Sequence, residues 1–378
     1  MGSELDSVVA GLLDVARDPR PGPEPISSLL QRVLEVIQGA TEADLNRALT
    51  DLVRGLHGPQ PQVGGHVAWA CGCLVEQGAD AETLCIALLD RLPRALDDAR
   101  RFVDAVAPLP EEEPDGTKGC YVRDRYVSQP QFLKLLQEDP VAAQSFTSLD
   151  GYCTGLIAAF SAAPHVLKEA GPSLRETLSG MDDVAEYTYF LDRLLRVPMD
   201  EQWFIIDAIH DRGFVVDVTG VANAFQVYAL LHDVLTRGPG GASDWSAPVN
   251  LPAPSPEVVD VARGRGAQRA EGVYIPSFTL FRWTAVSKAR RVPDSGCVNE
   301  WYCMSAIPAE LARFEGRRVG VIGEFNVQME FSIAREFGRL TAGIELRDEL
   351  PRSEVDRLMD AFTKTPDPGH PAPGVGWP

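Results

Sequence analysis

The stretch at residues 202–235, QWFIIDAIHDRGFVVDVTGVANAFQVYALLHDVL, decides the fold. Residues 203–209 are almost continuously apolar, which is typical of a strand covered on both faces. Residues 210–213 hold the Asp and Gly of a tight turn, and residues 214–221 alternate apolar and polar side chains as a second strand does. Residues 223–235 repeat apolar side chains at helical spacing. We therefore predict a strand, a turn, a strand and a helix in succession.

The N-terminal region predicts helices only. Apolar side chains recur three, four and seven positions apart in residues 30–37 and again in residues 45–56. Further helices are predicted at residues 65–77 and 80–106, the second with a kink at Pro93, because proline removes a helical hydrogen bond. Short amphipathic helices in series fit either an irregular bundle or stacked pairs of the HEAT type. No fixed-period consensus separates these two arrangements.

Helices continue over residues 129–197. The clearest lies at residues 181–196, where Tyr187 falls on the apolar side. Strands and helices then alternate, and together they predict a mixed sheet of about five or six strands, a normal size. The further strands are predicted at residues 273–283, 301–306, 319–323 and 343–346, and the further helices at residues 307–314 and 330–337 and from Ser353 onward.

Pro- and Gly-rich stretches divide the chain. They predict a helical domain over residues 1–107 and a segment over residues 119–236 in which helices lead into the strand–turn–strand–helix unit. The rest of an α/β domain follows over residues 257–364, and the tail at residues 365–378 has too little apolar content to fold. The predicted class is α+β: a helical N-terminal region, bundle or HEAT-like, packed on a C-terminal α/β domain with a mixed sheet.

Composition limits the class of protein. The 378 residues are 45% hydrophobic and carry a net charge of −19, which argues against binding nucleic acid or an anionic membrane over most of the surface. No apolar run reaches the roughly 18–20 residues that span a bilayer, and the acidic N-terminus lacks the basic region of a signal peptide. The cysteines are seven, an odd number. We therefore expect reduced thiols in a cytoplasmic protein.

Two blocks of the C-terminal half resemble an uncharacterised family of actinobacterial proteins. They are residues 213–235, GFVVDVTGVANAFQVYALLHDVL, and residues 299–323, NEWYCMSAIPAELARFEGRRVGVIG. The resemblance lies in a Gly-Phe strand, a Phe-Gln helix, a Trp-rich strand and an Ile-Pro segment before an Arg-Val strand. This sequence departs from the family at residues 224–226 and 304–305, where more polar or glycine-rich residues are expected. The resemblance implies a shared fold and no assigned activity.

The best cluster of polar side chains lies where the first strand of the decisive stretch ends. Asp207, His210 and Asp211 stand there together, and a carboxylate beside an imidazole can orient a general base. The same residue types are good turn formers, and no local motif links a serine or cysteine nucleophile to His210. We favour the interpretation that these residues simply form the turn, with His210 exposed to solvent. Acid/base chemistry is the alternative.

A basic segment at residues 263–291 runs against the charge of the chain, with seven Arg and Lys residues and a single Glu. Arg282 and Trp283 in this segment, together with Trp301, are the candidate binding residues, because basic and aromatic side chains together hold anionic ligands. We favour the other interpretation, in which the segment forms a solvated loop and an apolar strand and its basic residues pair with the acidic N-terminal helices, since surface ion pairs are common.

No metal site and no cofactor are predicted. Cys71 and Cys73 lie two positions apart, which on a helix points their thiols about 200° away from each other, and His66 does not complete a four-ligand zinc set. The glycines at residues 320–323 lack the third glycine of a dinucleotide-binding motif. The sequence therefore favours packing roles for these residues.

Two functional classes follow. The favoured one is an acidic interaction or accessory protein whose helical region docks a protein partner, because strong charge selects a partner and speeds encounter. The alternative is an enzyme acting on a small anionic molecule in a cleft between the helical region and the sheet. Asp207, His210 and Asp211 would supply acid/base chemistry, and Arg282 and Trp283 would hold the substrate. The first is favoured because the local motifs of common enzyme families are missing.

Overall fold

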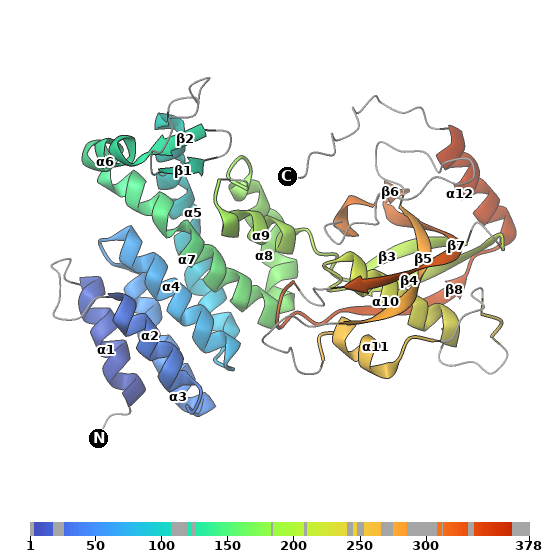
Figure 1. Cartoon of the computed structure of the whole chain (residues 1–378), viewed down its shortest axis with the longest axis horizontal. Helices are drawn as coiled ribbons and strands as arrows, with labels where there is room; N and C mark the ends of the chain where they lie inside the picture. The colour runs from blue at the N-terminus through green and yellow to red at the C-terminus, as the bar shows by residue number, and fades with distance from the viewer. Residues whose placement is uncertain are drawn as a thin grey trace. The chain divides into compact units, whose positions relative to one another are not determined.

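Figure 1 shows the computed structural model of the chain. It divides into two compact units, Met1–Leu195 and Arg196–Pro378, which we call the helical unit and the α/β unit. The boundary falls within the predicted segment at residues 119–236. The described residues are 4–17, 26–106, 119–122, 125–182, 184–207, 210–239, 245–247, 253–265, 275–285, 308–311, 313–331 and 336–364.

The helical unit confirms the predicted all-helical N-terminal region and adds one small hairpin at residues 119–128. Two of its helix starts follow from side-chain caps: Thr41 Oγ1 accepts the Asp44 N–H, and Asp80 Oδ1 accepts the Glu82 N–H. Its elements are α1 (Glu4–Arg17), α2 (Ile26–Ile37), α3 (Glu42–Leu52), η1 (Val53–His57), α4 (Pro61–Glu76), α5 (Ala81–Ala105), β1 (Gly119–Val122), β2 (Arg125–Ser128), α6 (Gln129–Glu138), α7 (Pro140–Ala162), α8 (Pro164–Leu178) and α9 (Glu186–Leu195).

Helix α7 is the central helix of this unit and packs on α4 and α5. Glycines let α4 and α7 approach until their backbones touch. A Cβ atom on Gly151 would lie 2.1 Å from the carbonyl oxygen of Gly65, and one on Gly155 would lie 2.5 Å from the carbonyl oxygen of Ala68. No side chain fits at either place, so the crossing depends on glycine.

The α/β unit contains the predicted mixed sheet. The strands follow the order β5-β7-β3-β4-β8, and the short β6 pairs with β7. β3 pairs with β4 in an antiparallel hairpin and with β7 in parallel, whereas β5 and β8 are antiparallel to their neighbours. The elements are β3 (Glu201–Asp207), β4 (Arg212–Thr219), α10 (Ala224–Arg237), α11 (Pro256–Ala262), β5 (Ile275–Ala285), η4 (Pro308–Glu310), β6 (Arg313–Phe314), β7 (Arg317–Phe331), β8 (Gly343–Glu349) and α12 (Arg352–Lys364).

Helices cover both faces of this sheet, which explains the continuous apolar run of β3. Trp203 and Ile205 point to one face, where α10 and α11 complete the core. Phe204 and Ile206 point to the other face, which α12 covers. Alternate residues of a strand project to opposite faces, so a strand buried on both sides must be apolar throughout. The predicted strand is thereby confirmed for residues 203–207, whereas residues 208–209 lie outside the described residues.

Two predicted helices of this unit differ from the described structure. The segment at residues 307–314 contains the short turn η4 and the strand β6. Glu315 and Gly316, with φ of 48° and 80°, then turn the chain from β6 into β7, and these left-handed values break a helix. The helix predicted at residues 330–337 is wrong at its start, because β7 continues to Phe331, where β5 still pairs with it; residues 332–335 lie outside the described residues. The strand predicted at residues 301–306 and the tail at 365–378 lie outside the described residues.

Helix α9 also differs from its prediction. It begins at Glu186 rather than near residue 181. Its buried face is formed by Thr188, Leu191 and their neighbours, whereas Tyr187, predicted on the apolar side, is 37% exposed. The part of the chain that the structure describes has no helix long and apolar enough to cross a membrane.

Candidate functional site

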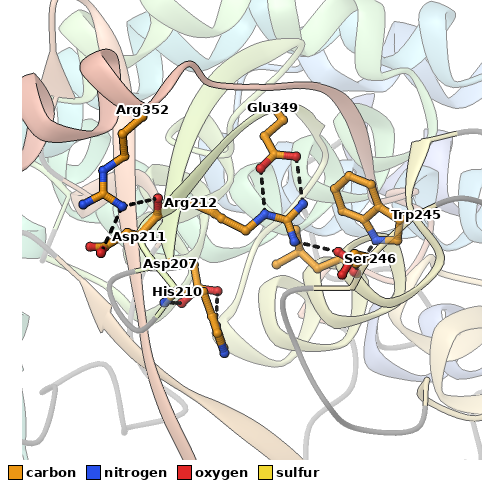
Figure 2. A network of polar contacts seen from close by, with 9 residues as sticks. Asp207, His210, Asp211, Arg212, Trp245, Ser246, Glu349 and Arg352 are labelled. Atoms are coloured by element: carbon orange, nitrogen blue, oxygen red, sulfur yellow. Dashed lines mark hydrogen bonds and ion pairs between the residues drawn. The ribbon is translucent and has the colours of Figure 1, made fainter.

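Asp207 and His210 are in contact at the end of β3 (Figure 2). The buried carboxylate of Asp207 places Oδ2 2.7 Å from Nδ1 of His210, and its Oδ1 accepts the His210 backbone N–H at 3.1 Å. A carboxylate this close is an acceptor, so a neutral His210 ring carries its proton on Nδ1. The imidazole side chain is 54% exposed, and its Nε2 is the nitrogen left to take up a proton.

The β3–β4 turn creates this contact. Asp207 pairs with Arg212 as the last rung of the antiparallel ladder, and Asp211 takes a left-handed φ of 52°, which Asp tolerates better than most residues. Asp211 itself does not join the pair. Its carboxylate binds Arg352 of α12 at 2.9 Å, where both side chains are exposed. The structure therefore brings together two of the three predicted catalytic residues.

Arg212 contacts its neighbour Phe214 and several partners that are distant in sequence. Its Nε and one terminal nitrogen donate to the two carboxylate oxygens of Glu349 at 2.6 and 2.7 Å, and the other terminal nitrogen donates to the Ser246 carbonyl at 2.6 Å. The guanidinium also lies 5.0 Å from the Trp245 ring centre and 5.2 Å from that of Phe214. The Arg212 hydrogen bond lowers the pKa of Glu349. Arg212 thus ties β8 and residues 245–247 to the hairpin.

The pairing of the strands shows how far the backbone of the predicted binding residue Trp283 lies from Asp207. Asp207 pairs with Ile322 of β7, and Ile322 in turn pairs with Trp283 of β5. The backbone of Trp283 therefore lies two strands from Asp207, about 10 Å across the sheet. Arg282 falls at an irregularity of the same ladder. The side chains of residues 275–285, and all of Trp301, lie outside the described part of the structure.

A second ionic cluster, which the sequence does not reveal, holds the opposite end of β3. Arg318 donates from Nε to Glu201 Oε2 at 2.7 Å, and Arg313 donates to Glu201 Oε1 at 2.6 Å. Arg318 also donates to the carbonyls of Ala309 and Leu311. Burial alone would raise the pKa of Glu201, but the two arginines lower it overall. The cluster fixes η4 against the sheet, which is a structural role.

The cysteines of α4 and α5 are packing residues. Burial raises the pKa of Cys73 to about 11 and that of Cys85 to about 12, and it raises the pKa of Cys71 further. These thiols are protonated at neutral pH and are poor nucleophiles and poor metal ligands. Among the described residues, no group of three or more His, Cys, Asp and Glu side chains could hold a metal ion.

Charge and exposed apolar side chains gather on the helical unit. It has 30 acidic and 16 basic residues, a net charge of −14, whereas the α/β unit has 24 and 19, a net charge of −5. The exposed large hydrophobic side chains of the described residues also lie in the helical unit: Leu34, Ile86, Leu133, Val141, Tyr187 and Tyr189. The excess of Asp and Glu is visible in the sequence. Which hydrophobic side chains are exposed could be seen only in the structure.

Comparison with known proteins assigns the chain to no family. No family model, no curated protein and no solved structure matches the chain. The resemblance to the actinobacterial family stays a prediction.

Proposed function

We propose that this chain is an acidic interaction protein whose helical unit docks a protein partner. The observation that supports the proposal is the coincidence of the −14 charge and the exposed hydrophobic side chains on one unit. A few residues supply most of the binding energy of an interface, and tyrosine, which is among the exposed side chains of this unit, is one of the types most often found there. Charge steers the encounter and selects the partner. A partner fits both properties if its surface is basic and also offers apolar contacts.

A photo-crosslinking experiment tests this proposal on the full chain. A benzophenone amino acid replaces Ile86 or Leu133 of the helical unit, or, as the matched control, the exposed Arg347 of β8. We expect a discrete protein adduct from Ile86 or Leu133 in the native cytoplasm, and we expect it to fade at high salt. Adducts from Arg347 alone, or none from either helical position, would contradict docking through the helical unit.

The second candidate function is acid/base catalysis on a small anionic molecule. The Asp207–His210 contact of 2.7 Å supports it, because a buried carboxylate that orients an imidazole is a common catalytic pair. The pair also stands at the carboxyl end of a strand in a parallel ladder, where α/β sheets often bind ligands. His210 Nε2 would remove a proton from the substrate or from a water molecule.

Native mass spectrometry tests the catalytic alternative. The gently purified full chain should then carry extra mass that disappears on denaturation, and the variant His210→Ala should lose that mass at an unchanged thermal midpoint. Arg352→Ala, which removes an exposed ion pair of the same turn, is the control and should keep it. A bare chain, or a mass excess that survives His210→Ala, argues against a ligand at this pair.

A further inference from the structure

Helix α9 carries a continuous aromatic surface. The ring centres of Tyr187 and Phe190 lie 6.1 Å apart, and those of Tyr189 and Phe190 lie 5.6 Å apart. Tyr187 is 37% and Tyr189 45% exposed. Single exposed apolar side chains are ordinary, but contiguous ones mark interaction surfaces. We name Tyr187, Tyr189 and Phe190 the α9 aromatic patch.

The patch already holds one cation of the chain itself. The guanidinium of Arg193 lies 5.7 Å from the centre of the Tyr189 ring, and its terminal nitrogen donates to the Tyr189 hydroxyl at 3.2 Å. The Arg193 side chain is itself buried, whereas Tyr189 is 45% exposed. The exposed remainder of the tyrosine surface offers the same electron-rich π system to a cation from outside.

Carboxylates border the patch. Asp150 of α7, which is exposed, accepts the backbone N–H of Tyr187 at 3.2 Å, and Glu186 is exposed beside that tyrosine. The helical unit around them carries a net charge of −14. Exposed aromatic rings next to carboxylates provide both cation–π and ionic contacts for one ammonium or guanidinium group.

We propose that the α9 aromatic patch anchors a segment of the partner that is rich in lysine or arginine. The proposal rests on the proposed docking function and names its site and the chemistry of its ligand. A second copy of this chain also carries a basic segment, at residues 263–291, but its net charge of −19 opposes the approach of two copies, so we assign the site to another protein. A basic segment of another protein can make cation–π contacts with the rings and ion pairs with the carboxylates.

A defined basic probe tests the patch on the full chain. We would titrate the protein into a fluorescein-labelled ten-residue lysine peptide and follow fluorescence anisotropy at low and moderate salt. The double variant Tyr187→Ser, Tyr189→Ser should raise the Kd about tenfold, the effect of losing two exposed cation–π contacts. Tyr187→Phe with Tyr189→Phe keeps both rings and should bind nearly as the wild type does. Gln38→Ser, an exposed and uncharged change in the turn after α2, is the control and should leave the Kd unchanged.

The outcomes separate the patch from the wider proposal. A double serine variant that binds as well as the wild type, or that is weakened no more than Gln38→Ser, overturns the patch and leaves docking elsewhere on the helical unit. A full chain that binds no lysine peptide at low salt overturns the basic partner as well. If the double variant loses its far-UV circular dichroism, Tyr187→Lys takes its place. Its like charge should weaken binding at least as much, and unchanged binding would overturn the patch.

Discussion

The helical unit and the α/β unit bring their elements together by different contacts. In the helical unit, the backbones of α4 and α7 touch at Gly65 and Gly151. Around β3 in the α/β unit, arginine–glutamate pairs join neighbouring elements, as in the pairs of Arg212 with Glu349 and Arg318 with Glu201. The first arrangement has no tolerance for added volume. The second is sensitive to the loss of a charge.

The two units can be followed separately in one sample. Trp69 is the single tryptophan of the helical unit, and the other five of the six tryptophans lie in the α/β unit. Tryptophan fluorescence during urea unfolding therefore reports mainly on the α/β unit, whereas circular dichroism at 222 nm weights the helices. Each prediction below is a shift in one of these two transitions, since a two-unit chain need not unfold in one step.

The largest effect is expected from Gly151→Ala. The new Cβ atom would meet the Gly65 carbonyl at 2.1 Å, so α4 and α7 must separate. Overpacking of this kind costs about 3 kcal/mol or more, which exceeds the gain of about 1 kcal/mol from the better helix former. The circular dichroism transition should move to lower urea. Gly39→Ala, with nothing within 4 Å of its Cβ, should change it little. Equal effects would disprove the backbone contact.

Glu201→Gln should have the next largest effect, now on the fluorescence transition. The change leaves Arg318, which is 7% exposed, without its carboxylate, and losing a hydrogen bond to a charged group costs about 1.5–3 kcal/mol. Glu345→Gln removes a mostly exposed carboxylate of β8 that pairs with Arg347, and it should cost far less. Similar losses of stability in the two variants would show that the buried Glu201 cluster contributes no more than a surface ion pair.

The same variant gives a pH dependence of known sign. Because the arginines lower the pKa of Glu201 in the folded protein, its contribution is complete above the unfolded pKa of about 4.3. The contribution is lost as the pH falls through the lowered folded value. The wild-type α/β unit should therefore lose stability below about pH 4.3, and Glu201→Gln should flatten that loss. Parallel pH curves for the two proteins would contradict the assignment.

Gly213→Ala sharpens the comparison between the units. Its Cβ would lie 2.7 Å from Cγ2 of Val355 and 3.0 Å from Cδ1 of Leu350, which are the ends of side chains rather than backbone. These groups can move, so we expect a cost of about 1 kcal/mol, at the low end for overpacking. A shift as large as that of Gly151→Ala would show that the packing of α12 on the sheet is equally rigid.

The smallest effect is expected from Arg352→Ala. This arginine pairs with Asp211 and Asp356, and all three side chains are more than half exposed. Such pairs contribute about 0–1 kcal/mol and are screened by salt. The fluorescence midpoint should therefore shift slightly at low salt and by still less at 0.5 M salt. A large shift that is independent of salt would mean that Arg352 fixes the turn through its backbone contact to Asp211.

Local pattern was sufficient for the elements around β3. The strand predicted at residues 203–209 is Glu201–Asp207, and the helix predicted at residues 223–235 is Ala224–Arg237, with Asn223 accepting the Gln226 N–H as its cap. Apolar runs and caps are properties of neighbouring residues, so one sequence records them. The length of β7 was missed because pairing with β5 extends it.

The candidate site could be predicted only where its residues are neighbours. Asp207 and His210 are three positions apart, and their contact followed from the turn. The partners of Arg212 could not be foreseen, because Glu349 lies 137 positions away and Trp245 lies beyond α10. The α9 aromatic patch was missed for another reason. Tyr187 falls on the apolar side of a helix that begins at residue 181, but α9 begins at Glu186 and leaves Tyr187 exposed.

The parallel pairing of β3 with β7 has a consequence for synthesis of the chain. Trp203 lies opposite Arg318, 115 residues later, so the middle of the sheet closes only after most of the chain has been made. Contacts this distant in sequence form slowly, and until β7 arrives, the apolar edge of β3 stays open to other chains. The helical unit precedes β3 and can fold first. Its strong negative charge then travels with the nascent sheet and keeps neighbouring copies apart during that interval.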